Sequence, residues 1–199
     1  MIVIGLTGSI AMGKSTAAAL FAEFGVPVCE SDAIIHDLYA KGGAAVAPIA
    51  NLFPDAVMNG AINRGELAEI LGRDPSGFAK LEAIAHPLVR NTQDGFLRQH
   101  RAAGAAIVVL DIPLLFETGR DRDVDKIVVV SAPEAVQRER ALARPGMTEE
   151  KLALLLSRQI PDSEKRRRAD FVVDSGQGID RARAQIRAIL VALSPNQGP

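Results

Sequence analysis

Short runs of apolar, mostly β-branched residues recur along the chain, and the longer stretches between them carry helical patterns. Because these runs are apolar without alternation, they are typical of strands that are buried on both faces of a sheet. The connections are long enough to contain helices, which favours parallel crossovers over hairpins. The pattern therefore predicts an α/β fold. The predicted strands cover residues 2–6, 26–30, 106–111, 126–131 and 171–174. The predicted helices cover about 14–24, 31–40, 63–72, 87–102, 133–143, 148–159 and 179–193.

Two of the connections are too long to be simple crossovers. Residues 33–104 separate the second and third predicted strands, and residues 138–168 precede the last strand. A chain of 199 residues is long enough for one well-filled core but not for two full domains. We therefore expect a single domain with two insertions.

The composition limits the classes of protein to be considered. Hydrophobic residues make up 48% of the chain and aromatic residues only 4%, so the core consists mainly of small aliphatic side chains. The formal net charge of -1 argues against general binding to nucleic acid or to an acidic membrane. Cys29 is the only cysteine, the N-terminus lacks the features of a signal peptide, and no apolar run approaches the roughly 20 residues that span a bilayer. We therefore predict a cytoplasmic protein that binds neither nucleic acid nor membrane.

The clearest motif is "GSIAMGKS", residues 8–15, which satisfies the pattern G-x-x-x-x-G-K-[ST] between a predicted strand and a predicted helix. The glycines allow the backbone N–H groups to turn inward onto phosphate oxygens, and the start of the helix favours an anion there. Lys14 can reach the β- and γ-phosphates, the Ser15 hydroxyl can hold Mg²⁺, and Thr16 can support the adjacent phosphate. An ordinary glycine-rich turn is the alternative, which the full motif and its context disfavour. The predicted phosphate-binding residues are Gly8, Ser9, Ile10, Ala11, Met12, Gly13, Lys14, Ser15 and Thr16.

Two carboxylates lie at or just after the carboxyl ends of predicted strands, and both are expected at the same edge of the sheet, where ligands of such folds bind. Asp32 could accept a hydroxyl proton or orient Mg²⁺ through water, or else Ser31 or Asp32 could simply cap a helix. Asp111 ends the run "AIVVLD" and could close the strand, support Mg²⁺ indirectly or take part in the chemistry itself. Glu117, in "IPLLFE", is a further acidic candidate.

The insertion at 138–168 is rich in basic residues and reads as a lid that brings arginines onto the transferring phosphates. A solvated helical face is the simpler interpretation for most of these residues. Arg140 and Arg144, four positions apart, are the two we select as functional. The basic residues are Arg138, Arg140, Arg144, Lys151, Arg158, Lys165, Arg166, Arg167 and Arg168.

Of the three histidines, His86 precedes Pro87 at the expected start of a helix, where a structural role and a substrate contact are both open. His36 and His100 have no partner at the spacing of metal ligands, so we predict no zinc site.

Five segments together resemble the successive motifs of the dephospho-coenzyme A kinase family. They occur in the family's order from residue 6 to about residue 176 and read "LTGSIAMGKST", "SDAIIHDL", "HPLVR", "DIPLLFE" and "RQIPDSEKRRRADFVVDSG". The resemblance implies ATP-dependent phosphorylation of the ribose 3′-hydroxyl of dephospho-CoA, the last step of coenzyme A synthesis. It also implies a P-loop kinase core with a five-stranded parallel sheet, an acceptor-binding insertion at 33–104 and a lid at 138–168.

The resemblance carries roles over to particular residues. Asp32 matches the carboxylate near the acceptor hydroxyl, His86 and Pro87 match a motif of the acceptor-binding part, and Leu114 is placed among the acceptor contacts. Arg140 matches a lid arginine near the ATP phosphates. ATP and Mg²⁺ are the implied cofactors, dephospho-CoA is the implied partner, and a monomer or weak homo-oligomer is expected.

The sequence departs from the family at three positions. Ser9 and Met12 stand where Gly and Ser are frequent, but both are variable positions of the loop, so the backbone cradle should survive. Ser175 stands where Asn is common, and a hydroxyl makes a less selective contact with adenine than an amide does. The rival functions are another small-molecule or nucleotide kinase and a P-loop regulatory ATPase. A GTPase is disfavoured because the sequence has no N-K-x-D motif.

Overall fold

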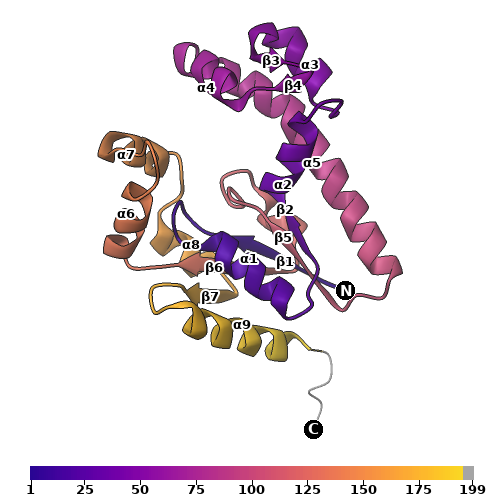
Figure 1. Cartoon of the computed structure of the whole chain (residues 1–199). Helices are drawn as coiled ribbons and strands as arrows, with labels where there is room; N and C mark the ends of the chain where they lie inside the picture. Colours follow the sequence, from indigo (N-terminus) through magenta and orange to yellow (C-terminus); the bar gives the residue numbers. More distant parts are fainter. Residues whose placement is uncertain (195–199) are drawn as a thin grey trace. The chain divides into compact units, whose positions relative to one another are not determined.

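The computed structural model describes residues 1–194, in which the predicted α/β fold is confirmed (Figure 1). Five strands form the central sheet in the order β2-β5-β1-β6-β7, and β1 pairs in parallel with both β5 and β6, as β6 does with β7. The strands are β1 (Ile2–Thr7), β2 (Val28–Glu30), β5 (Ile107–Asp111), β6 (Lys126–Ser131) and β7 (Phe171–Asp174). Each overlaps one of the five strands predicted from the sequence.

The chain forms two compact units. One contains Met1–Cys29 and the chain from His100 onward, and the other is Glu30–Gln99. The sequence placed an insertion at 33–104, and its function as an acceptor-binding part remains a prediction.

The core of the first unit lies between the sheet and two helices, α1 (Lys14–Glu23) and α9 (Ile179–Leu193). Ile4 and Leu6 of β1 project from one face of the sheet and are completely buried with Phe21 of α1 and Ile186 of α9. The alternate residue Gly5 faces the opposite side, so strand periodicity divides β1 between the two faces of the sheet. This packing fixes β1 and α1, the two elements that flank the predicted phosphate loop.

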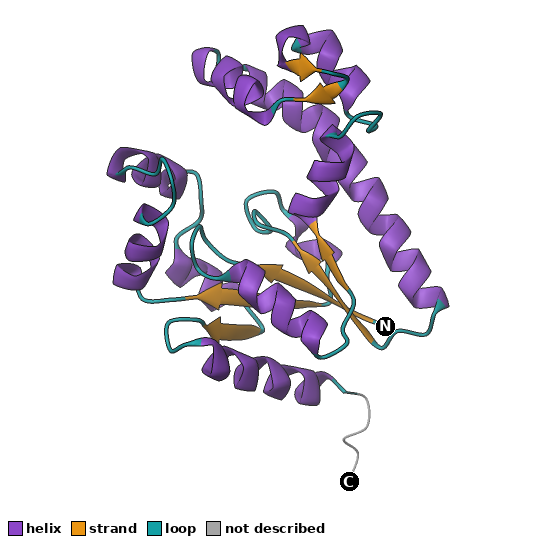
Figure 2. Cartoon of the chain, viewed as in Figure 1, coloured by secondary structure: helices purple, strands orange, loops and turns teal. Residues whose placement is uncertain are grey.

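The connection from β6 to β7 contains three helices (Figure 2). They are α6 (Glu134–Leu142), α7 (Glu149–Ser157) and α8 (Asp162–Arg168). The sequence analysis predicted the first two but not α8. This helix reads "DSEKRRR" and buries only Lys165, so it has no apolar stripe from which a helix could be recognised.

The second unit is mostly helical. It contains α2 (Ser31–Tyr39), α3 (Val46–Leu52), α4 (Arg64–Arg73) and the first part of α5 (Gly77–Ala102). A short antiparallel hairpin joins β3 (Val57–Met58) to β4 (Ala61–Ile62). Neither α3 nor the hairpin was predicted, although Asn59-Gly60, both with positive φ, is a typical hairpin turn that the sequence analysis overlooked.

The predicted start of α5 at Pro87 is wrong. The helix begins at Gly77 and Pro87 lies inside it. Proline is frequent in the first turn of helices, which is why residue 87 was taken as the start. Pro87 has no N–H to donate to the helix, but the helix continues past it despite this missing hydrogen bond. None of the helices within residues 1–194 combines the length and hydropathy that a bilayer-crossing helix requires.

One carboxylate ties β7 to β6 and makes stability depend on pH. Asp170 accepts a hydrogen bond from the Ile127 N–H at 2.8 Å and pairs with the Lys126 ammonium at 3.0 Å. Burial alone would raise the pKa of Asp170, but these contacts stabilise the carboxylate and hold the pKa below its usual value of 3.8. Because the folded-state pKa is lowered, the stabilisation is present above that value and is lost as the pH falls through the folded-state pKa.

We therefore expect Asp170→Asn to lower the free energy of unfolding by about 1 kcal/mol at neutral pH, since the pair is partly exposed. Urea denaturation of both proteins should show this difference shrinking as the pH falls below 3.8 and through the lowered folded-state pKa. A difference that stays unchanged as the pH falls well below 3.8 would contradict the assignment.

Candidate active site

The phosphate loop, residues 8–13, joins β1 to α1 and passes close to the backbone of Val130 in β6. A Cβ on Gly8 would lie 2.6 Å from the Val130 carbonyl oxygen, so only glycine allows this approach. Gly13 has φ 86° and Ala11 has φ 60°, and the Met12 N–H closes the turn on the Ser9 carbonyl oxygen at 3.2 Å. The sequence motif thus forms a loop whose shape depends on its glycines.

Side chains from distant segments contact the loop. The Met12 sulfur accepts a hydrogen bond from the Ala132 N–H at 3.1 Å, and the Met12 carbonyl accepts one from the Ser175 hydroxyl at 2.7 Å. Two glutamines that the sequence analysis did not consider, Gln137 and Gln159, bind the backbone of Ile10. Gln159 lies in the segment "RQIPDSEKRRRADFVVDSG", but the sequence did not indicate that either glutamine contacts the loop, because these contacts span about 130 to 150 positions of the chain.

Lys14 forms an ion pair with Asp111. The ammonium lies 2.5 Å and 2.7 Å from the two carboxylate oxygens, and the side chains are 13% and 5% exposed. The register of the sheet explains the pairing, because Asp111 lies opposite Leu6, at the same edge at which β1 ends and the loop begins. Both oxygens of Asp111 are therefore directed at the lysine that the motif assigns to the phosphates.

A cavity of about 320 Å³ adjoins the loop. Arg140 lines this cavity and donates hydrogen bonds to both the Ser175 hydroxyl and the Ser175 carbonyl, each at 2.9 Å. Arg144 also lines the cavity, although it lies beyond the end of α6 and not on a helical face shared with Arg140. The remaining lining is largely small or apolar: Ala11, Gly13, Thr16, Ala17, Val130, Val173, Ser175, Gly178, Ile179 and Ala182.

The oxygen ligands available for Mg²⁺ are few. Ser15 and Thr16 are exposed at the start of α1, and hydroxyl oxygens suit this hard cation. Across the described part of the chain, no group of three or more His, Cys, Asp or Glu side chains could hold a metal. Such a site suits Mg²⁺ that takes most of its ligands from nucleotide phosphates and water.

The predicted acceptor residues divide between the two units. Asp32, His86 and Pro87 belong to Glu30–Gln99 and are exposed, whereas Leu114, 39% exposed, follows β5 in the first unit. Asp32 is the second residue of α2, and the helix N-cap is Glu30. The alternative in which Ser31 or Asp32 caps this helix is therefore wrong.

The fold and the loop define a P-loop kinase. A model of the dephospho-CoA kinase family matches residues 2–180, so the chain belongs to the dephospho-CoA kinase family. A dephospho-CoA kinase of Mesorhizobium japonicum is 56% identical over 199 residues, which are 100% of both chains.

Solved structures support the fold. A protein from Thermus thermophilus has a TM-score of 0.82 at 34% identity, with 97% of this chain and 98% of that chain covered. The dephospho-CoA kinase from Campylobacter jejuni has a TM-score of 0.67 at 21% identity, with 96% and 97% covered, and supports the fold.

The close approach at Gly8 can be tested directly. Gly8→Ala should weaken ATP binding by about tenfold or more, because the added Cβ meets backbone and the loop must shift. Isothermal titration with ATP measures the effect. Gly72→Ala is the matched control, since a Cβ there meets no atom within 4 Å, and its ATP affinity should equal that of the unaltered protein. Equal affinity in both variants would mean that the loop tolerates a side chain at residue 8.

Proposed function

We propose that this protein transfers the γ-phosphoryl group of ATP to the ribose 3′-hydroxyl of dephospho-CoA, which yields coenzyme A and ADP. The observation that carries the proposal is the family match over residues 2–180. The phosphate loop, its lysine and the adjoining cavity supply the physical features that such a reaction needs.

In the proposed reaction, the 3′-oxygen attacks the γ-phosphorus while the bond from that phosphorus to the β–γ bridging oxygen breaks. Lys14 and the N–H groups of the loop hold the β- and γ-phosphates, where fixed positive charge stabilises the transition state. Asp111 holds the Lys14 ammonium at the edge of the sheet before nucleotide arrives. Asp32 accepts the proton of the 3′-hydroxyl as the new P–O bond forms.

Mg²⁺ would be held by the Ser15 hydroxyl together with phosphate oxygens, with Asp111 as an indirect support, and would neutralise charge on the phosphates. Arg140 and Arg144 border the cavity beside Gly13, and we assign them to the nucleotide. The Ser175 hydroxyl already donates to Met12 and accepts from Arg140. Selection of adenine therefore falls mainly to other groups of the cavity, such as backbone N–H and C=O groups.

His86, Pro87 and Leu114 are proposed acceptor contacts, in keeping with the family motifs that they match. Cytoplasmic localisation and the absence of nucleic-acid or membrane partners remain our proposal, based on the single cysteine and the net charge of -1. A monomer or a weak homo-oligomer is the expected state.

A competition assay tests the reaction. The protein is incubated with labelled ATP, Mg²⁺ and equal concentrations of dephospho-CoA, AMP, gluconate and shikimate, and the phosphorylated products are separated. Selective formation of the 3′-phosphorylated product is expected. Transfer to another acceptor would support a different small-molecule kinase, and ATP binding without multiple turnover to any acceptor would support a regulatory ATPase.

The role of Asp32 is tested by Asp32→Asn. The amide keeps the size of the side chain but cannot take the proton, so turnover should fall by roughly 10²-fold or more while ATP affinity stays unchanged. Asp37→Asn, an identical change at an exposed position of the same helix, is the control and should leave turnover unaltered. Turnover that barely differs between the two variants would remove Asp32 from the chemistry.

A further inference from the structure

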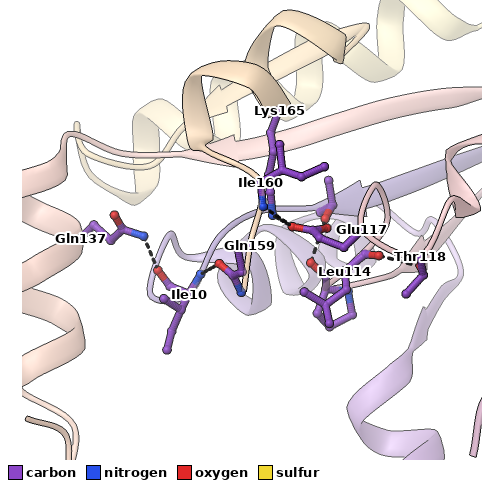
Figure 3. A network of polar contacts seen from close by, with 10 residues as sticks. Ile10, Leu114, Glu117, Thr118, Gln137, Gln159, Ile160 and Lys165 are labelled. Carbon is purple, nitrogen blue, oxygen red and sulfur yellow. Dashed lines mark hydrogen bonds and ion pairs between the residues drawn. The ribbon is translucent and has the colours of Figure 1, made fainter. Parts of the chain in front are cut away.

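Ile10, the third residue of the phosphate loop, is held at both of its backbone polar groups (Figure 3). Its N–H donates to Gln159 Oε1 at 3.1 Å, and its carbonyl oxygen accepts from Gln137 Nε2 at 2.9 Å. Gln137 lies on α6, whereas Gln159 follows α7, so the two glutamines reach the loop from separate parts of the β6–β7 connection. We name these two side chains the Ile10 clamp.

The segment that carries Gln159 is itself fixed to the core. The Ile160 N–H donates to Glu117 Oε1 at 2.9 Å, and the ammonium of Lys165 lies 2.8 Å from the same oxygen (Figure 3). Lys165 is completely buried and Glu117 is 13% exposed. Breaking a buried ion pair leaves an uncompensated charge, which is strongly unfavourable. The contacts with Glu117 therefore hold residues 159–165 in place.

A second contact fixes the same segment. Asp162 Oδ2 accepts a hydrogen bond of 2.6 Å from the hydroxyl of Ser131, the last residue of β6. Residues 159–165 are thus attached both to the end of a sheet strand and to the loop after β5. Gln159 therefore binds Ile10 from a segment that is held by contacts with both Glu117 and Ser131.

Because the peptide bond is planar, these two hydrogen bonds also fix the orientation of the neighbouring C=O and N–H groups of the loop. In a trans peptide the C=O and N–H groups point in opposite directions. By holding the Ile10 N–H, Gln159 orients the carbonyl of Ser9, which accepts the Met12 N–H and closes the turn. By holding the Ile10 carbonyl, Gln137 also fixes the orientation of the Ala11 N–H, which belongs to the same peptide group.

The loop needs such support because its own sequence does not supply it. Ala11 adopts φ 60°, a conformation that costs a residue with a side chain roughly 1–2 kcal/mol. No glycine occurs between Gly8 and Gly13. Contacts from outside the loop must therefore hold residues 9–12 in this conformation.

We propose that Gln137 and Gln159 are positioning residues for phosphoryl transfer, which hold the two peptide groups of Ile10 so that the phosphate loop is formed before ATP binds. Neither side chain has to touch the reacting atoms. The kinetic part of this proposal rests on the proposed function, whereas the structural part does not.

Amide hydrogen exchange at Ile10, followed by NMR on the nucleotide-free protein, tests the structural part. Gln159→Leu removes the acceptor, and Ile10 should exchange about tenfold faster, as the loss of one hydrogen bond predicts. Gln159→Glu keeps an acceptor oxygen at the same reach and should retain the slow exchange. Gln99→Leu, the same change at an exposed site, is the control. Unchanged exchange at Ile10 in Gln159→Leu would overturn the proposal.

Steady-state kinetics test the functional part. Gln137→Leu and Gln159→Leu should each lower kcat by about tenfold or more, because misplaced phosphates react slowly, while KM for dephospho-CoA stays unchanged. Melting temperatures establish that the variants are folded. Equal kcat in both variants and the unaltered protein would overturn the role in transfer.

If Gln137→Leu fails to fold, the kcat of the Gln159 variants alone tests the role in transfer. If the unaltered protein does not phosphorylate dephospho-CoA, the proposed function fails, but the exchange result still reports on the Ile10 clamp.

Discussion

The approach of Gly8 to the carbonyl oxygen of Val130 is the constraint on which the rest of the site depends. A Cβ at residue 8 would lie 2.6 Å from that oxygen, and because the oxygen belongs to β6, neither side can yield without moving a sheet strand. The loop must therefore leave β1 along one narrow path. The left-handed conformation of Gly13 then directs the chain into α1, so that Lys14 begins the helix. Two glycines at a fixed spacing thus fix the two ends of the loop, and with them the position of Lys14.

The sheet topology supplies the partners that complete the loop. β1 lies between β5 and β6, and β7 lies beyond β6, so the ends of four parallel strands meet at one edge. Asp111 comes from the end of β5, Ser131 from the end of β6, and Ser175 follows β7 directly. These residues are far apart in sequence but contact the loop or its supports. The same arrangement explains why a ligand cavity adjoins the loop at this edge.

The strands and the phosphate loop could be predicted because each depends on local sequence. Buried parallel strands require continuous apolar runs, and the loop requires its glycines, lysine and hydroxyl in order. The burial of Lys165 could not be predicted, because a charged residue is expected at the surface unless its partner is known, and Glu117 lies 48 positions earlier in the sequence. The Ile10 clamp was missed for the same reason, since glutamine has no pattern that indicates a backbone partner. The error at Pro87 is different: a local rule about helix starts was applied where the long helix α5 overrides it.

A crystal structure of the protein with Mg²⁺ and a non-hydrolysable ATP analogue would test the central claim, which is that the phosphate loop is built by the protein before nucleotide binds. We expect the phosphates along residues 8–16, the base in the cavity bordered by Arg140 and Ser175, and loop Cα positions within about 1 Å of those described. The hydrogen bonds of Ile10 to Gln137 and Gln159 should both be retained. A loop that refolds around the phosphates and releases Ile10, or phosphates bound elsewhere, would contradict the account.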